Sequence, residues 1–142
     1  MNTSLVSANL DLVRSIYSAW GRGDFSSIEW ADPEIEYVVA GGPEPGKWTG
    51  IAGMAQGVRG ILSAWEDFRS EAEEYRELDD EHVLVLTRLS GRGKTSGMEL
   101  EQTQPKGADL FEIRGGKIMK VVTYWERERP LADFGLAEES RS

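Results

Sequence analysis

Asp109 has the setting in this sequence that most favours chemistry. It begins an apolar segment that ends at Ile113, and because side chains alternate along a strand it shares a face with Phe111 and Ile113. A carboxyl on an otherwise buried face has a raised pKa, which suits a general base or a neutral hydrogen-bond donor. We therefore predict that Asp109 lies in a pocket and is the candidate catalytic group. The alternative is a structural aspartate that caps a bulge after Pro105.

Arg88 is the second polar candidate, because it lies in a run that is apolar on both faces. It shares a face with Leu84 and Leu86, and a buried arginine needs a carboxylate partner or an anionic ligand. Paired with Asp109 or Glu36, it would help to bind an acidic or carbonyl-bearing small molecule. The alternative places Arg88 at a sheet edge or a dimer interface.

Aromatic side chains supply the predicted wall of the pocket. Small-molecule sites are typically lined by aromatic residues with a few polar groups, although the same residues also suit an ordinary core. Trp30 and Trp65 are interpreted as core. The aromatic residues predicted to contact a ligand are Tyr17, Trp20, Trp48 and Trp125.

Composition excludes several classes of site. The chain of 142 residues has no cysteine and one histidine, so thiolate chemistry is excluded and a zinc site is not expected. His82 follows an acidic turn, where an exposed position is expected. No phosphate-binding loop or hydrolase motif is present, and we predict no cofactor.

Charge and hydropathy limit the partners. The net charge of −9 argues against nucleic-acid binding, which needs clustered Lys and Arg. No apolar run is long enough to cross a membrane, and the first residues do not have the pattern of a secretory signal. We expect a cytoplasmic protein.

The elements that must position these residues follow from periodicity. Apolar spacings of three, four and seven predict helices, and alternation predicts strands. Helices are predicted over 4–22, 24–30 and 51–65, with a further short helix within 129–139. Strands are predicted over 35–39, 68–78, 82–90, 100–104 with 108–113, and 118–125, with a loop over 41–47 and a hairpin turn at 114–117. This order predicts one α+β domain over residues 1–142, in which three helices pack on a curved antiparallel sheet.

Four segments carry a family resemblance that covers nearly the whole chain. The first helix ends in an aromatic stripe followed by Gly23-Asp24, a Trp48–Gly53 loop precedes a helix, Asp109–Ile118 forms a strand–turn–strand unit, and Leu131–Leu136 lies in the tail. In order and spacing these resemble the SnoaL-like domains of the nuclear transport factor two-like superfamily. The resemblance implies a cone-shaped fold around one cavity. The superfamily includes polyketide cyclases, ketosteroid isomerases, epoxide hydrolases, dehydratases and binding modules.

The resemblance also bears on individual residues. It places Asp109 where polyketide cyclases and ketosteroid isomerases keep a pocket carboxyl. Val38 stands near the position of the isomerases' proton-shuttling carboxylate, and Ile16 at that of their tyrosine, with Tyr17 about 100° round the helix. The histidine that accompanies the cyclases' aspartate has no counterpart. The resemblance therefore gives Asp109 no catalytic partner, and steroid-type isomerisation is not expected.

Two functions follow as hypotheses. The first is a cofactor-independent isomerase, cyclase or hydrolase acting on a small apolar carbonyl or polycyclic compound, with Asp109 as acid or base. The second is a non-catalytic ligand-binding or protein-interaction module. A carboxylate hydrogen-bonded to a second titratable group would favour the enzyme. Because the run from Val83 to Leu89 is apolar on both faces, we also predict a homodimer.

Overall fold

The structure is a computed structural model, and it describes residues 3–25, 29–40, 46–93 and 106–125. Two helices and six strands occupy these ranges. The order is α1 (Thr3–Trp20), β1 (Ala31–Ala40), β2 (Gly46–Thr49), α2 (Gly50–Ala64), β3 (Trp65–Glu77), β4 (His82–Gly93), β5 (Lys106–Arg114) and β6 (Lys117–Tyr124).

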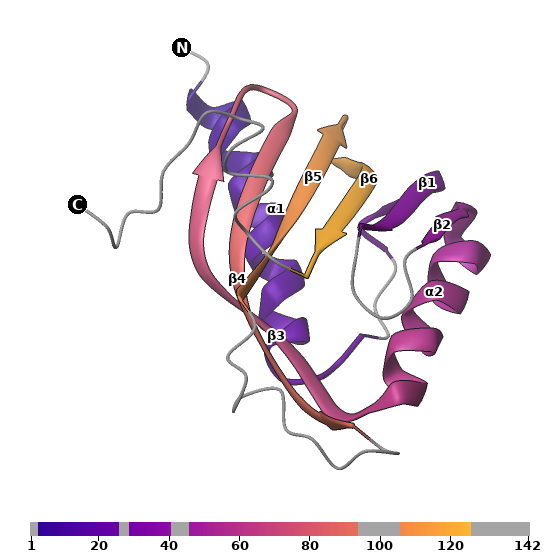
Figure 1. Cartoon of the computed structure of the whole chain (residues 1–142). Helices are drawn as coiled ribbons and strands as arrows, with labels where there is room; N and C mark the ends of the chain where they lie inside the picture. The colour runs from indigo at the N-terminus through magenta and orange to yellow at the C-terminus, as the bar shows by residue number, and fades with distance from the viewer. Residues whose placement is uncertain (1–2, 26–28, 41–45, 94–105, 126–142) are drawn as a thin grey trace.

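The six strands form one curved sheet in the order β2-β1-β6-β5-β4-β3 (Figure 1). The pair β1–β6 is parallel, and the other pairs are antiparallel. The α+β class is confirmed, but the prediction of a purely antiparallel sheet is wrong. Sequential hairpins produce antiparallel neighbours, whereas β1 pairs with a strand far along the chain, which local patterning does not reveal. The short edge strand β2 was also missed, because the glycines and prolines around it indicate a loop.

The helices are fewer than predicted within the described residues. Asp24 and Phe25 are not helical, and Glu29 and Trp30 form a turn. Gly23 adopts a φ of 82° and its N–H donates to the carbonyl of Trp20 at 2.9 Å, a left-handed ending that stops α1. The remaining residues of that predicted helix, 26–28, and the predicted tail helix over 129–139 lie outside the described residues.

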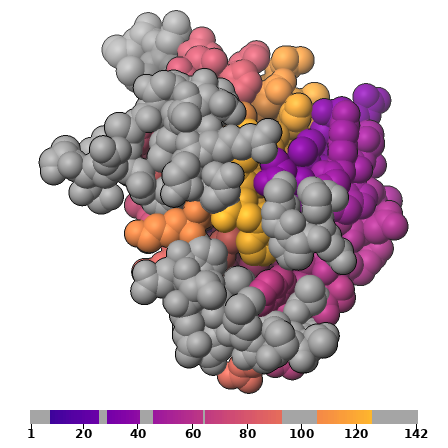
Figure 2. Space-filling model, in the orientation of Figure 1, coloured from indigo at the N-terminus to yellow at the C-terminus, as the bar shows by residue number. Residues whose placement is uncertain are grey.

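Both helices pack on the concave face of the sheet. α1 lies against β3 and β4, and α2 lies against β1 and β2, where it forms one side of the molecule in the space-filling view (Figure 2). The core joins α1 residues Val13 and Ile16 to Met54 of α2 and to Phe111 and Val121 of the sheet. Neither helix is long and apolar enough to cross a membrane, as judged over the described residues.

Two glycines of α2 offer a matched pair of variants. A Cβ on Gly57 would lie 2.9 Å from the Trp48 ring and 3.0 Å from that of Tyr37, whereas one on Gly53 would meet Trp48 at 3.4 Å. We expect Gly57→Ala to lower the free energy of unfolding by about 1–3 kcal/mol through overpacking. Gly53→Ala should raise it by about 0.4–1 kcal/mol, because alanine restricts the unfolded chain. Urea denaturation would measure both, and equal effects would contradict this packing.

Candidate functional site

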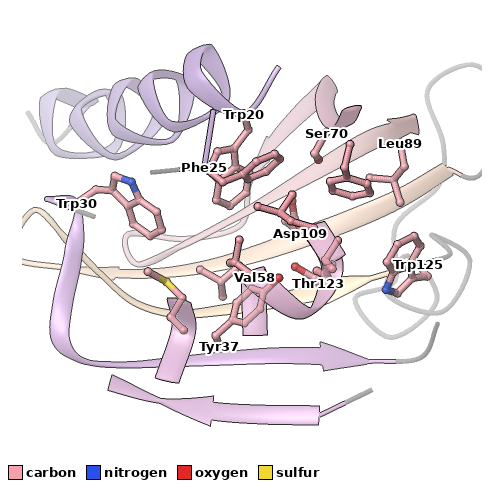
Figure 3. Close-up of a pocket in the computed structure, with 15 residues that line it drawn as sticks. Trp20, Phe25, Trp30, Tyr37, Val58, Ser70, Leu89, Asp109, Thr123 and Trp125 are labelled. Carbon is pink, nitrogen blue, oxygen red and sulfur yellow. The ribbon is translucent and has the colours of Figure 1, made fainter. Parts of the chain in front are cut away.

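A pocket opens on the concave face between α2, the end of α1 and the sheet (Figure 3). It contains about 690 Å³ of empty space with its mouth included. Its wall is mainly aromatic and aliphatic. It is lined by Trp20, Phe25, Trp30, Tyr37, Met54, Val58, Ile61, Leu62, Phe68, Ser70, Leu89, Asp109, Val121, Thr123 and Trp125.

Asp109 projects from β5 into this pocket and is 3% exposed. Antiparallel pairing places it opposite Val85 of β4 and Thr123 of β6. Since directly paired residues share a face of the sheet, the three side chains form one row on the concave side. The alternation that puts Phe111 in the core therefore also puts the Asp109 carboxyl in the pocket wall.

Hydroxyl groups surround the carboxyl. The Tyr17 hydroxyl donates a hydrogen bond to Oδ2 of Asp109 in a buried position. Thr123 also hydrogen-bonds the carboxyl, and it makes a second hydrogen bond with the Tyr37 hydroxyl, toward which it points in Figure 3. Since a threonine hydroxyl has one proton and can also accept, Tyr37 can donate to Thr123 while Thr123 donates to an ionised Asp109.

Burial dominates the electrostatics of this group. Desolvation raises the pKa of Asp109 from 3.8 to about 6, although the hydrogen bonds from Tyr17 and Thr123 favour the ionised form. Desolvation, followed by the nearby Asp109 charge, raises the pKa of Tyr17 well above 10.0. The same two causes raise the pKa of Tyr37. At neutral pH the phenols therefore remain proton donors, while Asp109 titrates near neutrality.

Tyr17 corrects the expectation that Asp109 lacks a partner. Its ring is packed edge-on against Phe111, with centroids 5.9 Å apart, and against Trp20 at 5.2 Å. Val13, Tyr17 and Trp20 are spaced by four and three residues, so they share one helical face. That spacing places Tyr17 on the buried face of the helix, but it does not indicate which residue of the sheet Tyr17 contacts.

Arg88, Trp48 and Tyr17 are predicted ligand contacts that are not among the residues lining the pocket, and for Arg88 this is the alternative stated above. The Arg88 side chain is 58% exposed and its Nη2 lies 3.1 Å from Oε1 of Glu71. It lies on the opposite face of β4 from Val85, and a charged side chain there remains solvated. Trp48 instead stacks on Tyr37, with centroids 5.9 Å apart, beside the glycines of α2.

The other residues considered from the sequence lie either in the pocket lining or outside it. Trp20 and Trp125 line the pocket, and Trp30 belongs to the core, as predicted, and to the pocket lining as well. His82 is partly exposed, with Nδ1 2.9 Å from Oδ1 of Asp79, and lies outside the pocket lining. No group of three or more potential metal ligands occurs among the described residues.

The chain is similar to one relative in sequence and to two solved structures in fold. The uncharacterized protein Rv0034 of Mycobacterium tuberculosis is 28% identical over 127 residues, which cover 83% of this chain and 88% of that protein. Bal32a from a soil-derived mobile gene cassette has a TM-score of 0.72 at 18% identity, covering 84% of this chain and 89% of its own. TerC, co-crystallized with polyporic acid, has a TM-score of 0.71 at 16% identity, covering 91% of this chain and 97% of its own.

A third similar structure names an activity class, and the family match covers most of the chain. The structure is a putative SnoaL-like polyketide cyclase from Jannaschia sp. CCS1, with a TM-score of 0.70 at 13% identity over 82% of this chain and 84% of its own. The SnoaL-like domain model matches residues 13–121, a range that includes Tyr17 and Asp109. The protein therefore belongs to the SnoaL-like domain family, whose fold forms a pocket for small molecules.

Proposed function

We propose that this protein binds a small, flat, largely apolar carbonyl compound and that Asp109 acts on it as a general acid and base. One observation carries the proposal: a buried carboxyl in an aromatic pocket is hydrogen-bonded to a second titratable group, Tyr17. A pKa of about 6 suits proton transfer near neutral pH. The carboxylate predominates and can take a proton, and the carboxylic acid that then forms can return it. The similar putative SnoaL-like polyketide cyclase supports this class of chemistry.

The proposed reaction begins with removal of a proton from the carbon next to a carbonyl group. The Asp109 carboxylate takes the proton, the electrons of the C–H bond form a C=C bond, and the carbonyl electrons move to oxygen. The protonated Asp109 then returns a proton to the same carbon or to another, which gives exchange or isomerisation. Tyr17 and Thr123 hold the carboxylate in place through their hydrogen bonds.

Proton exchange on a simple ketone tests this proposal. In D₂O, we expect the protein to accelerate exchange of the α-hydrogens of 2-tetralone for deuterium, followed by NMR, with a rate that rises with pH through about 6. Asp109→Asn should slow this exchange by at least about 100-fold, the usual contribution of a general base. Arg88→Ala, on the opposite face, should leave it unchanged.

The outcome distinguishes catalysis from binding. A thermal shift with 2-tetralone but no accelerated exchange would contradict catalysis and favour the ligand-binding module. Exchange that is insensitive to Asp109→Asn would contradict the assigned role of Asp109.

We also propose that the protein forms a homodimer through the opposite face of the sheet. Leu84, Leu86 and Ala108 form a second apolar cluster there, and Leu110 and Tyr124 pack against it while only partly buried. Light scattering after size exclusion should give the mass of two 15.8 kDa chains at micromolar concentration, and Leu110→Asp should give that of one. A single-chain mass for the unsubstituted protein would contradict this proposal.

A further inference from the structure

Trp125 has the one buried side-chain nitrogen or oxygen that lacks a hydrogen-bond partner among the described residues. The atom is the indole Nε1, which is a donor only. Buried polar groups are normally paired, so an unpaired donor in a pocket wall needs an explanation. The side chain belongs to the pocket lining, and Figure 3 shows it at one end of the pocket.

The orientation of Trp125 is fixed by neighbouring aromatic rings. Its ring centroid lies 6.1 Å from that of Phe68 and 6.5 Å from that of Trp65. An indole held in this way presents its N–H in a set direction, which favours recognition of an acceptor over accommodation by rotation.

The same pocket contains the Trp125 side chain and Asp109. Thr123 is paired directly with Asp109, and Trp125 follows two residues later, just beyond the end of β6 at Tyr124. Asp109, Thr123 and Trp125 all line the pocket. One small molecule in the pocket can therefore contact both Asp109 and Trp125.

The hydroxyl groups that hydrogen-bond Asp109, and the hydroxyl next to them, are already engaged. The Tyr17 hydroxyl donates to Asp109, and the hydroxyls of Thr123 and Tyr37 hydrogen-bond each other. Proton abstraction next to a carbonyl group develops negative charge on its oxygen, which needs a donor placed in advance. Trp125 supplies a donor that the protein itself does not use.

We propose that the indole N–H of Trp125 hydrogen-bonds the carbonyl oxygen of the ligand and stabilises the enolate that forms when Asp109 removes the neighbouring proton. This inference rests on the proposed function and adds a requirement for the ligand. The carbon that loses its proton must be bonded to a carbon that carries an acceptor oxygen. The electrons of the C–H bond pass into the C=C bond of the enolate, the C=O pair moves to the oxygen, and the proton moves to Asp109.

Two probes with nearly the same skeleton test the inference: 2-tetralone carries the carbonyl acceptor, and tetralin lacks it. In ¹H–¹⁵N spectra of the unsubstituted protein, 2-tetralone should move the Trp125 indole proton downfield, and tetralin should not. Trp125→Phe should weaken binding of 2-tetralone about fivefold, as expected for one hydrogen bond, and leave tetralin binding within twofold. It should slow α-exchange by about 10²–10³-fold, as for loss of one oxyanion donor.

Trp48→Phe is the matched control, because Trp48 packs on Tyr37 and is not part of the pocket lining. It should leave the exchange rate and the 2-tetralone affinity within twofold. Exchange that depends on Asp109 but is unchanged in Trp125→Phe would overturn this inference and leave the proposed function standing. A 2-tetralone-specific indole shift without any exchange would support Trp125 as the carbonyl donor and contradict catalysis. Equal weakening of both probes by Trp125→Phe would also overturn the inference.

Discussion

Replacing Asp109 with Asn is expected to stabilise the protein at neutral pH. Burial raises the pKa of Asp109 from 3.8 in an unperturbed chain to about 6 in the fold, so the folded state holds the proton more tightly than the unfolded state. The free energy of unfolding that this group contributes is fully present below pH 3.8 and is lost as the pH rises through about 6. Since one unit of pKa difference corresponds to about 1.4 kcal/mol, the loss is about 3 kcal/mol.

The variant should therefore differ from the parent by an amount that depends on pH. Its stability relative to the parent should increase by about 2.4 kcal/mol between pH 4 and pH 7, the part of the loss that falls in this range, measured by urea denaturation at each pH. The asparagine oxygen can still accept from Tyr17, so the hydrogen bond to that residue is retained.

Asp79→Asn provides a control of opposite sign. Hydrogen bonds from the Glu81 backbone and from His82 lower the pKa of Asp79, so it contributes stability above its unfolded pKa that is lost as the pH falls. This variant should become less stable relative to the parent as the pH rises through 3.8. A constant difference between Asp109→Asn and the parent across this pH range would contradict the raised pKa of Asp109.

Phe111→Ala is expected to cause the largest loss of stability. Phe111 is fully buried, two residues from Asp109, and its ring packs against those of Tyr17 and Trp20 at 5.9 and 6.2 Å. Removing a buried phenylalanine ring lowers the free energy of unfolding by about 3–5 kcal/mol, because the hydrophobic burial of the ring is lost and a cavity is left behind. The midpoint of urea denaturation should fall accordingly.

Leu110→Ala is the comparison for this variant, since Leu110 is the adjacent residue and only partly buried on the opposite face. Its loss should be smaller than that of Phe111→Ala. A loss of less than about 1 kcal/mol for Phe111→Ala would mean that this ring is not part of a close-packed core.

Alternation and helical spacing were sufficient to predict most of the fold. The strand through Asp109 and Ile113, the turn at Gly115-Gly116 and the helix through Met54 follow from local patterns. The parallel pairing of Val38 with Val122 does not, because it joins distant parts of the chain. Local patterns also gave no sign of how glycines in α2 accommodate Trp48.

The position of Asp109 could be predicted from local patterns, but the residues around it could not. Asp109 could be assigned to a face because the other residues of that face are strongly apolar. β4 is apolar on both faces, with Leu84 and Val85 both 0% exposed, so its pattern could not indicate which face looks into the pocket. The prediction for Arg88 therefore stayed open between the pocket and a sheet edge or dimer interface. Tyr17 was missed as the partner of Asp109 because that contact depends on how α1 is rotated against the sheet.

Direct titration of the Asp109 carboxyl tests the central claim, that this group is buried in the pocket and titrates near neutral pH. The carboxyl carbon can be followed by ¹³C NMR between pH 3 and pH 8 and assigned by its absence in Asp109→Asn. We predict a midpoint of about 6. A midpoint at or below 3.8, the unperturbed value, would contradict a desolvated carboxyl and the acid–base role built on it.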